Sequence, residues 1–422
     1  MREMKNSGIE WMGEIPVEWK IVKGKYFLQY QQKPVKEDDG VITCFRDGEV
    51  TLRSNRREDG FTVSDKEIGY QGIDVGDLVV HGMDGFAGAI GISDSRGKAS
   101  PVLNVLDTQE NKRYIMYYLR CAAYREVFLA LATGIRVRSC DLRWNKLGEL
   151  QYLLPNLNEQ RSIVNFLDTK CAEIDSLTAD IQTQIDTLEQ YKRSVIAEAV
   201  TKGLNPDVEM KDSGARWCPL IPARWELMPA KYLFHNSDLR KQSGDEQLTA
   251  SQKYGIITQQ AYMELENASI VLANKGVENW KHVEPNDFII SLRSFQGGLE
   301  MSETTGCITW HYVVLKASHN ICHQYYKWLF KSAQYINALQ GTCNFIRDGQ
   351  DLRFSNFAQV PLLVPSIEEQ EAIAVYLTQK TSEIDAIITE KKEQLSALAE
   401  YKKSLIYEYV TGKKEVPADG EQ

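Results

Sequence analysis

The chain contains two copies of one long segment, and this internal repeat limits its possible folds more than any other feature. Residues 141–203 align with residues 351–413 without a gap at an offset of 210, and residues 4–26 align with residues 210–232 at an offset of 206. A repeat of about 200 residues is much longer than a solenoid unit, so each copy should be a whole domain with its own helix. The sequence therefore predicts a pseudo-two-fold internal repeat and a target that also has two halves.

Residues 158–202 and 368–412 are predicted to form long helices, each roughly 65 Å in length. Neither segment contains a proline, or a glycine before its end, and apolar residues recur every seven positions, as in helix-on-helix packing. The first segment carries Leu167, Ile174, Ile181, Leu188 and Val195, and the second carries Leu377, Ile384, Leu398 and Leu405, with an interruption at Lys391. A second row is expected to complete the seam, formed by Ile163, Leu177 and Tyr191 with Ile373, Ile387 and Tyr401, and Ile185 is expected to widen it. The alternative of two amphipathic helices, each lying on its own domain, stays open.

Length, cysteine usage and hydropathy narrow the class of protein. At 422 residues the chain is longer than one hydrophobic core usually serves, so two or more domains are expected. It has no run of about 18 apolar residues, its N-terminus leads into no apolar segment, and its eight cysteines are scattered. We therefore expect a cytoplasmic protein with reduced cysteines and without a membrane span or signal peptide.

The net charge of −9 is unevenly distributed. Residues 158–203 and 366–422 together hold 12 basic and 20 acidic side chains, whereas residues 1–157 hold 22 of each kind. The larger blocks are therefore close to neutral, and a neutral block can still present one basic face to nucleic acid.

The two larger blocks are predicted to be mixed domains. Strand-like runs at 76–80 and 102–106 have counterparts at 286–290 and 312–315, and helices are expected near 111–132 and 320–340. The predicted fold class is α+β, with two mixed α/β globular domains separated by two long helices that form an antiparallel coiled coil. The predicted boundaries are 1–157 (block one), 158–203 (first long helix), 204–365 (block two), 366–412 (second long helix) and 413–422 (flexible tail). Because the block interiors diverge while their ends and helices agree, we interpret the interiors as two different recognition domains.

Catalytic motifs are missing from the sequence. It contains neither G-x-G-x-x-G after a strand nor G-x-x-x-x-G-K-[ST], and no Asn/Asp-Pro-Pro-aromatic motif of an amino-methyltransferase. The glycines within residues 82–88 are typical of a turn, and the His and Cys residues within 319–323 lack a second pair at zinc-finger spacing. We therefore predict no catalytic residue and no metal site in this chain.

Candidate nucleic-acid contacts in block one are basic residues in polar stretches. They are Lys33, Arg46, Arg53, Arg56, Arg57, Arg136 and Arg138. Arginine offers paired N–H donors to phosphate and to guanine. A solvated charged surface is the alternative, since Glu49, Glu58 and Asp59 lie among these arginines.

Candidate contacts in block two cluster in three loops. They are Ser251, Gln252, Lys253 and Tyr254, then Arg293, Ser294 and Gln296, and finally Asn344 and Arg347. Amides can pair with adenine edges, lysine with phosphate or guanine, and tyrosine can stack. Block one contains no evident counterpart of the string Ser251–Gly255.

Several of these motifs resemble the specificity subunits of type I DNA restriction–modification enzymes. The resemblance rests on the Ser-Gly-x-x-Trp…Ile-Pro-x-x-Trp starts at 7–19 and 213–225, and on Ser251–Gly255. It also rests on the Pro…Glu-Gln leads at 154–160 and 362–370 and on the Tyr-Lys-[Lys/Arg]-Ser endings at 191–201 and 401–411. It covers nearly the whole chain, in the family's order of recognition domain, helix, recognition domain, helix.

The resemblance implies a non-catalytic subunit that reads a bipartite site on double-stranded DNA. Each domain would read one half, and the helices would pair as a spacer and dock what are expected to be two methyltransferase subunits. Those partners would methylate adenine with S-adenosylmethionine, and a separate motor and nuclease subunit would use ATP and Mg²⁺, so this chain would bind no cofactor. The alternatives are a coiled-coil scaffold that binds proteins rather than DNA, and a single-chain enzyme acting on nucleic acid.

Overall fold

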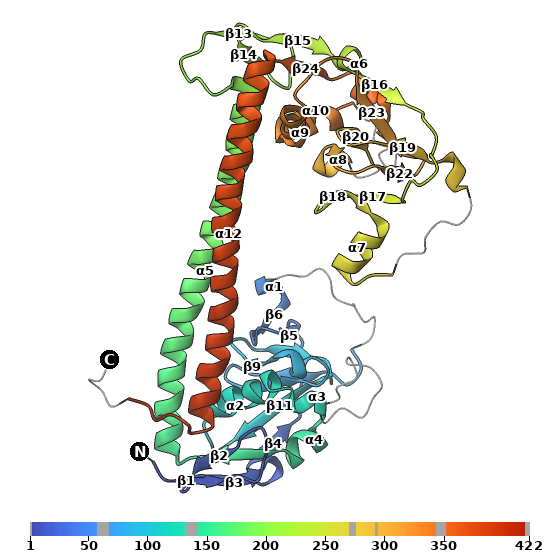
Figure 1. Ribbon diagram of the computed structural model, residues 1–422. Coiled ribbons are helices and arrows are strands. Elements are labelled where there is room, and N and C mark those ends of the chain that lie inside the picture. Colours follow the sequence, from blue (N-terminus) through green and yellow to red (C-terminus); the bar gives the residue numbers. More distant parts are fainter. Residues whose placement is uncertain are drawn as a thin grey trace. The chain divides into compact units, whose positions relative to one another are not determined.

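The computed structural model describes residues 2–56, 67–130, 142–269, 276–291, 294–342 and 352–417, which form two compact units (Figure 1). Unit 1 consists of residues 1–182 and 392–422, and unit 2 consists of residues 183–391. Each unit contains one globular block together with part of both long helices. No described helix is long and apolar enough to cross a membrane.

The long helices are α5 (Leu157–Lys202) and α12 (Ile367–Val410), which confirms both predicted helices to within two residues. Polar side chains cap their first turns, because Asn156 Oδ1 accepts the amide N–H of Glu159 at 3.0 Å and Ser366 Oγ accepts that of Glu369 at 3.3 Å. Both helices stop near a glycine in the left-handed region, Gly203 with φ 80° and Gly412 with φ 71°.

The two helices pack antiparallel within each unit. In unit 2, Lys192 Nζ lies 2.6 Å from a carboxylate oxygen of Asp385, and in unit 1 Lys402 Nζ lies 2.6 Å from one of Asp175. These two ion pairs are each other's counterparts at the 210-residue offset. The pairing is antiparallel, because Lys192 near the end of α5 contacts Asp385 in the first half of α12. Likewise, Asp175 in the first half of α5 contacts Lys402 near the end of α12.

The first predicted row of seam residues is confirmed. Leu167, Ile174, Ile181, Leu377, Ile384 and Leu405 are buried, and Leu188, Val195 and Leu398 are half-buried. The interruption at Lys391 is also present, and its ammonium group donates to Gln184 Oε1 at 2.5 Å.

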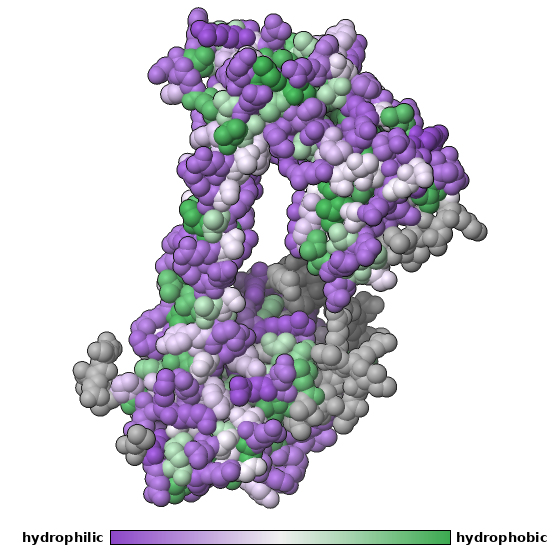
Figure 2. Space-filling view, in the orientation of Figure 1, coloured by the Kyte–Doolittle hydropathy of each residue, from purple (hydrophilic) through white to green (hydrophobic). Residues whose placement is uncertain are grey.

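The second predicted row is wrong for four residues. Leu177, Tyr191, Ile387 and Tyr401 are exposed, whereas Cys171, Ile185, Thr381 and Ile388, which lie on the other flank of the first row, are buried. A heptad seam can be completed three or four residues after a given position, and both flanks carry apolar side chains. The packing partner therefore decides which flank is covered, and apolar residues interrupt the otherwise hydrophilic helix surface (Figure 2).

The core of each block is a four-stranded antiparallel sheet, and the strand order is the same in both. In block one the order is β4 (Leu28–Gln31), β11 (Leu103–Thr108), β8 (Leu78–His81), β9 (Ile90–Ile92). In block two it is β16 (Phe234–Ser237), β23 (Val313–Ala317), β20 (Phe288–Ile290), β21 (Glu300–Met301). The strands expected near 76–80, 102–106, 286–290 and 312–315 are thus the inner strands of these sheets.

Four two-stranded antiparallel pairs accompany each central sheet. Block one contains β1 (Met4–Asn6) with β2 (Glu14–Pro16), β3 (Lys20–Lys23) with β12 (Gln151–Leu154), β5 (Ile42–Cys44) with β6 (Val50–Leu52), and β7 (Gln71–Ile73) with β10 (Gly97–Ala99). Block two contains β13 (Met210–Asp212) with β14 (Leu220–Pro222), β15 (Glu226–Pro229) with β24 (Pro361–Val364), β17 (Leu248–Ser251) with β18 (Gly255–Thr258), and β19 (Lys281–Val283) with β22 (Gly306–Ile308).

Short helices complete the blocks. They are η1 (Gly24–Tyr26), α1 (Arg53–Arg56), η2 (Gly85–Ala87), α2 (Lys112–Tyr124), α3 (Val127–Ala130) and α4 (Trp144–Glu149) in block one. In block two they are α6 (Ala230–Leu233), α7 (Gln259–Glu266), η3 (Val277–Asn279), α8 (Ser294–Gly297), α9 (His323–Lys331), α10 (Ala333–Gln340) and α11 (Phe354–Phe357). The single helix expected near 320–340 is divided at Ser332, whose extended backbone and hydroxyl cap α10.

The repeated sequence motifs form the junction between each block and the helices. The buried indoles of Trp19 and Trp225 donate to Glu159 at 3.1 Å and Glu369 at 2.9 Å, in the first turns of α5 and α12. Each block also bonds the end of the other long helix. Buried hydroxyls make these bonds, from Tyr114 to the Val410 carbonyl at 3.3 Å and from Tyr325 to the Val200 carbonyl at 3.1 Å.

Replacing Ile384 by Ala should destabilise the paired helices, because this side chain is only 3% exposed in the seam. We expect the apparent free energy of unfolding to fall by about 2–4 kcal/mol. Ile387 is 44% exposed and provides a matched control, since Ile387→Ala should cost less than about 0.5 kcal/mol. Urea denaturation followed by circular dichroism measures both variants, and equal losses would contradict the assigned seam.

Candidate nucleic-acid interface

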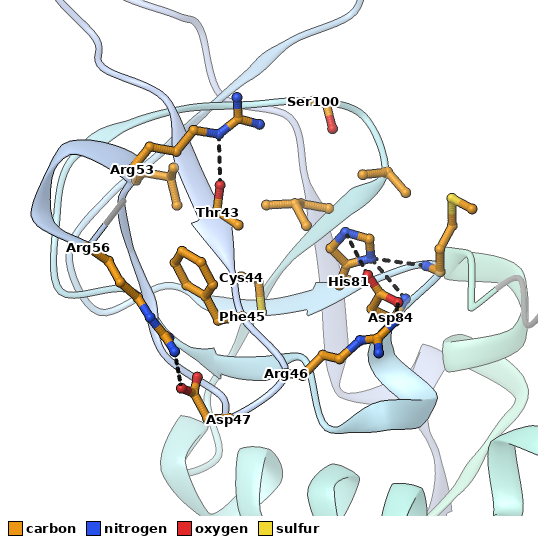
Figure 3. Close-up of a pocket in the computed structure, with 14 residues that line it drawn as sticks. Thr43, Cys44, Phe45, Arg46, Asp47, Arg53, Arg56, His81, Asp84 and Ser100 are labelled. Carbon is orange, nitrogen blue, oxygen red and sulfur yellow. Dashed lines mark hydrogen bonds and ion pairs between the residues drawn. The ribbon is translucent and has the colours of Figure 1, made fainter. Parts of the chain in front are cut away.

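An open hollow of about 840 Å³ in block one collects three of the predicted arginines (Figure 3). Arg46, Arg53 and Arg56 come from the turn of the β5–β6 hairpin and from α1, which directly follows β6. The opposite wall includes His81, at the end of β8, and Ser100, between β10 and β11. The hairpin thus concentrates cationic side chains that lie up to ten residues apart in the sequence.

Each of these arginines is held by a neighbour. Arg46 Nη2 lies 2.8 Å from Asp84 Oδ1, and Arg53 Nε donates to Thr43 Oγ1 at 3.0 Å. Arg56 lies over the Phe45 ring, 4.2 Å from its centroid, and pairs with Asp47 at 2.7 Å and Glu49 at 2.9 Å. The hydrogen bond with Asp47 raises the pKa of Arg56. Exposed ion pairs of this kind contribute little stability, so a phosphate or a base edge can replace the carboxylates.

His81 contributes to the shape of the hollow rather than to its charge. Its Nδ1 accepts backbone N–H groups from Asp84 at 2.9 Å and Met83 at 3.2 Å. Burial lowers the pKa of His81, and a ring nitrogen that accepts two N–H bonds is unprotonated. The imidazole therefore fixes the turn that presents Asp84 to Arg46.

In block two, the predicted string Ser251–Gly255 forms the turn of the β17–β18 hairpin. Lys253 is well exposed, its Nζ lies 2.9 Å from Glu266 Oε1 on α7, and it lies over the Tyr254 ring. The Tyr254 hydroxyl donates to the same carboxylate at 2.7 Å. Hydrogen bonds with Tyr254 and Glu266 raise the pKa of Lys253, so the turn presents a fully protonated ammonium group.

The two hairpins occupy the same place in the repeat. Their registers agree at an offset of 206, because Cys44 pairs with Val50 in one hairpin and Ala250 pairs with Ile256 in the other. A helix follows each hairpin at the same offset, since α1 begins at Arg53 and α7 begins at Gln259. Block one therefore does have a counterpart of Ser251–Gly255, namely residues 45–49, contrary to the expectation from sequence. The two turns share backbone position but no side chain, so a motif comparison misses them, whereas an ungapped alignment extended from residues 4–26 would find them.

Neighbouring helices pack closely against the turns of both hairpins. Arg120 Nη2 on α2 donates to the Asp47 carbonyl at 2.7 Å, and Gly48 has φ 92°. A Cβ on Gly48 would lie 2.6 Å from the Arg120 guanidinium, so only glycine fits without displacement. In block two, a Cβ on Gly297 of α8 would lie 3.0 Å from Gln252 Nε2. Helix α8 therefore packs closely against the turn of the β17–β18 hairpin.

Two predicted contacts are engaged inside their own block. Lys33 Nζ is bound by Asp77 at 2.6 Å and Asp74 at 2.8 Å. Ser294 is 1% exposed, and its Oγ accepts the Ser291 N–H at 2.8 Å. Both interactions hold loops in place. Arg57, Arg136, Arg138, Arg293, Asn344 and Arg347, and the side chain of Gln296, lie outside the described residues. For all of these residues the predicted DNA contact stays a prediction.

Metal ions require a set of ligating side chains gathered in one place. Among the described residues, no three His, Cys, Asp or Glu side chains gather so that they could hold a metal ion. The hollow instead combines guanidinium groups, an aromatic ring and small hydroxyls, which are groups that bind phosphates and base edges.

Comparisons with known proteins agree with this architecture of two domains, each followed by a long helix. Residues 222–397 match the family described as type I restriction modification DNA specificity domain. A protein of Methanocaldococcus jannaschii, named as a type I restriction enzyme MjaX specificity subunit, is 22% identical over 438 aligned residues, which cover 95% of each chain.

Two solved structures share the fold. A chain from a structure described as showing complex assembly and conformational transition of the type I R-M system has a TM-score of 0.69 at 12% identity, covering 95% of this chain and 99% of that one. The crystallised HsdS subunit of Thermoanaerobacter tengcongensis has a TM-score of 0.50 at 13% identity, covering 95% and 98%. The resemblance carried by the repeated motifs is confirmed, because residues 222–397 match the type I specificity domain and nearly the whole chain is similar to a protein named as a type I specificity subunit.

Replacing Gly48 by Ala should displace the turn of the β5–β6 hairpin, residues 45–49. The matched control is Gly76→Ala, because Gly76 has a similar φ of 84° but its Cβ would meet nothing within 4 Å. We expect the control to lose about 1 kcal/mol of stability from backbone strain, and Gly48→Ala to lose roughly 1–3 kcal/mol more from the clash. Urea denaturation measures the difference, and equal losses would contradict the close contact with Arg120.

Proposed function

We propose that this chain is the DNA-reading subunit of a type I restriction–modification complex and that it recognises a bipartite target. Block one would read one half through the β5–β6 hairpin and its arginines, and block two would read the other half through the β17–β18 hairpin. The match of residues 222–397 to a DNA specificity domain supports DNA as the ligand, and Arg46 with Arg53 and Arg56 of α1 in block one, and Lys253 in block two, supply donors suited to it.

One observation carries this proposal. Two hairpins of identical register stand at equivalent positions of a repeated framework, yet their turns differ at every residue, as Phe-Arg-Asp-Gly-Glu and Ser-Gln-Lys-Tyr-Gly. A constant backbone with variable polar side chains is what recognition of two unlike sequences requires. A scaffold that binds only proteins gives no reason for an exposed cation, Arg46 or Lys253, to stand in each of the two turns.

The chemistry of methylation and cleavage is assigned to partners. We propose that two methyltransferase subunits use S-adenosylmethionine, that a motor and nuclease subunit uses ATP and Mg²⁺, and that this chain binds none of these. The supporting observation is the lack of a catalytic motif in the sequence. Methyl transfer to DNA by the purified chain alone would favour the single-chain enzyme instead.

Arg46→Ala and Lys253→Ala should each weaken recognition of a different half-site. In the assembled complex we expect roughly tenfold weaker binding to target duplex if the lost contact is a bidentate base contact. If Lys253 touches only phosphate, sequence preference should survive and the salt slope should fall by about 1. Lys23→Ala is the control, because Lys23 is also exposed and paired with a glutamate, Glu149, at 2.7 Å, but lies on β3 outside both hairpins. Wild-type affinity in both variants would remove these residues from the interface.

Exchanging block one for that of a related chain should change one half of the target and leave the other half unchanged. The reason is that each block has its own central sheet, its own hydrophobic core and its own hairpin. Sequencing of methylated adenines in a host that expresses the chain with its partners reads out both halves. A single continuous short motif, or a change in both halves after the exchange, would contradict the two-reader proposal.

A further inference from the structure

Block two contains a second cationic hollow that none of the predicted contacts line. Its volume is about 690 Å³, and it is lined by Asp238, Arg240, Asn279, Lys281 and Trp310. These residues come from three places in the fold, namely the segment after β16, the η3–β19 junction, and the segment after β22. Backbone pairing of Arg240 with Lys281 joins the first two segments.

The hollow carries one surplus positive charge. Lys281 Nζ lies 3.1 Å from Asp238 Oδ1, and this hydrogen bond lowers the pKa of Asp238, so both groups are ionised and offset each other. Arg240 Nη1 donates to the carbonyl oxygen of Asn279 at 2.8 Å, which orients the guanidinium. Arg240 forms no direct ion pair with a described carboxylate, although its charge also lowers the pKa of Asp238, and its Nε and Nη2 groups make no hydrogen bond with the described residues. An oriented guanidinium with free N–H donors is suited to a phosphate.

A flat aromatic surface adjoins this guanidinium. Trp310 is 55% exposed and is the only tryptophan among the exposed large apolar side chains of the described residues. Its ring stacks on His311 with centroids 3.6 Å apart and an interplanar angle of 29°. An indole this exposed is unusual, because tryptophan normally buries most of its surface.

Block one does not repeat this combination. Pro101 stands at the position equivalent to Trp310, because the bridges of Lys98 and Cys307 show that this part of the repeat matches at an offset of 209. Pro34 stands at the position equivalent to Arg240, since the hydrogen bond from Gly72 to Lys33 corresponds to that from His282 to Leu239, and the nearby Lys33 is bound by Asp74 and Asp77. The hollow is therefore particular to block two and is not part of the shared framework.

We propose that this hollow binds the sugar-phosphate backbone of duplex DNA, with Arg240 on a phosphate and the Trp310 indole packed on the adjoining deoxyribose. This inference rests on the proposed function and adds to it a contact that is independent of base sequence. It would give the second half-site an anchor that the first half-site lacks.

The test measures the affinity of the assembled complex for a labelled duplex of random sequence over a range of salt concentrations. Arg240→Ala should weaken binding about tenfold and lower the salt slope by about 1. Trp310→Ala should weaken binding about fivefold without changing the slope, and Trp310→Phe should restore most of the loss. Asp238→Asn should tighten binding and steepen the slope, because it removes the carboxylate that offsets Lys281.

Matched controls come from the same unit. Tyr232 is also 55% exposed and lies beside a lysine, with Lys231 Nζ 5.3 Å from its ring centroid, but both belong to the repeated framework. Tyr232→Ala and Lys231→Ala should bind the random duplex as the unaltered complex does.

The other outcomes separate failure of the backbone site from failure of the proposed function. Unchanged affinity and slope in Arg240→Ala and Trp310→Ala, with normal binding by the unaltered complex, would overturn the backbone site and leave the proposed function standing. Failure of the unaltered complex to bind any duplex would overturn both. Loss of partner subunits from the variant complexes, with no loss of DNA affinity in the complex that remains, would show a protein-docking surface and overturn the DNA assignment.

Discussion

A partly buried hydrogen bond between an indole and a helix start is the interaction on which each half of the molecule depends. Trp19 and Trp225 are each 1% exposed, and each donates to a glutamate in the first turn of the long helix that follows its block. An indole N–H left unpaired at such a site would be costly, so the glutamate cannot be replaced without loss of stability. The matching residues of the two halves lie at this junction because the same interaction is made twice.

The junction also joins each block to both helices. Gln160 and Gln370 accept backbone N–H groups of Asn111 at 3.0 Å and Cys322 at 2.9 Å, while their amides donate to the prolines before the helices. Buried tyrosine hydroxyls then bond the final turn of the other long helix. Each block therefore forms hydrogen bonds with the start of one long helix and with the end of the other. Antiparallel pairing brings such a start and end together in both units.

The turns of the β5–β6 and β17–β18 hairpins can change their side chains without changing this framework. The strand register places residues 45–49 and 251–255 at the tips of equivalent hairpins, and a tip can change its side chains without changing the ladder beneath it. The cations there are paired with exposed carboxylates, and such pairs are weak and screened by salt. Arg46 and Lys253 are thus positioned by weak ion pairs with carboxylates. Such pairs can be replaced by contacts with a phosphate at little cost in free energy.

Much of the fold followed from the sequence, and the failures have identifiable causes. The long helices were predictable to within two residues because neither is interrupted by proline or glycine before its end. The covered flank of the seam was not predictable, since Leu177 and Ile185 are both apolar and only the partner helix chooses between them. The cationic character of the β5–β6 region was visible in Arg46, Arg53 and Arg56, but the engagement of Lys33 by Asp74 and Asp77 was not, because some 40 residues separate the lysine from them.

By itself, the sequence determined the duplication, the two helices and their first seam row, and the resemblance to specificity subunits, because these features depend on local periodicity and on repeated motifs. The tertiary structure alone decided that residues 45–49 and 251–255 form the tips of equivalent hairpins, that Ser294 is buried, and that Arg240 and Trp310 line one hollow. These relations depend on strand pairing between distant segments. Two turns with no side chain in common can occupy one place in a fold, because backbone hydrogen bonds set that place and side-chain identity does not.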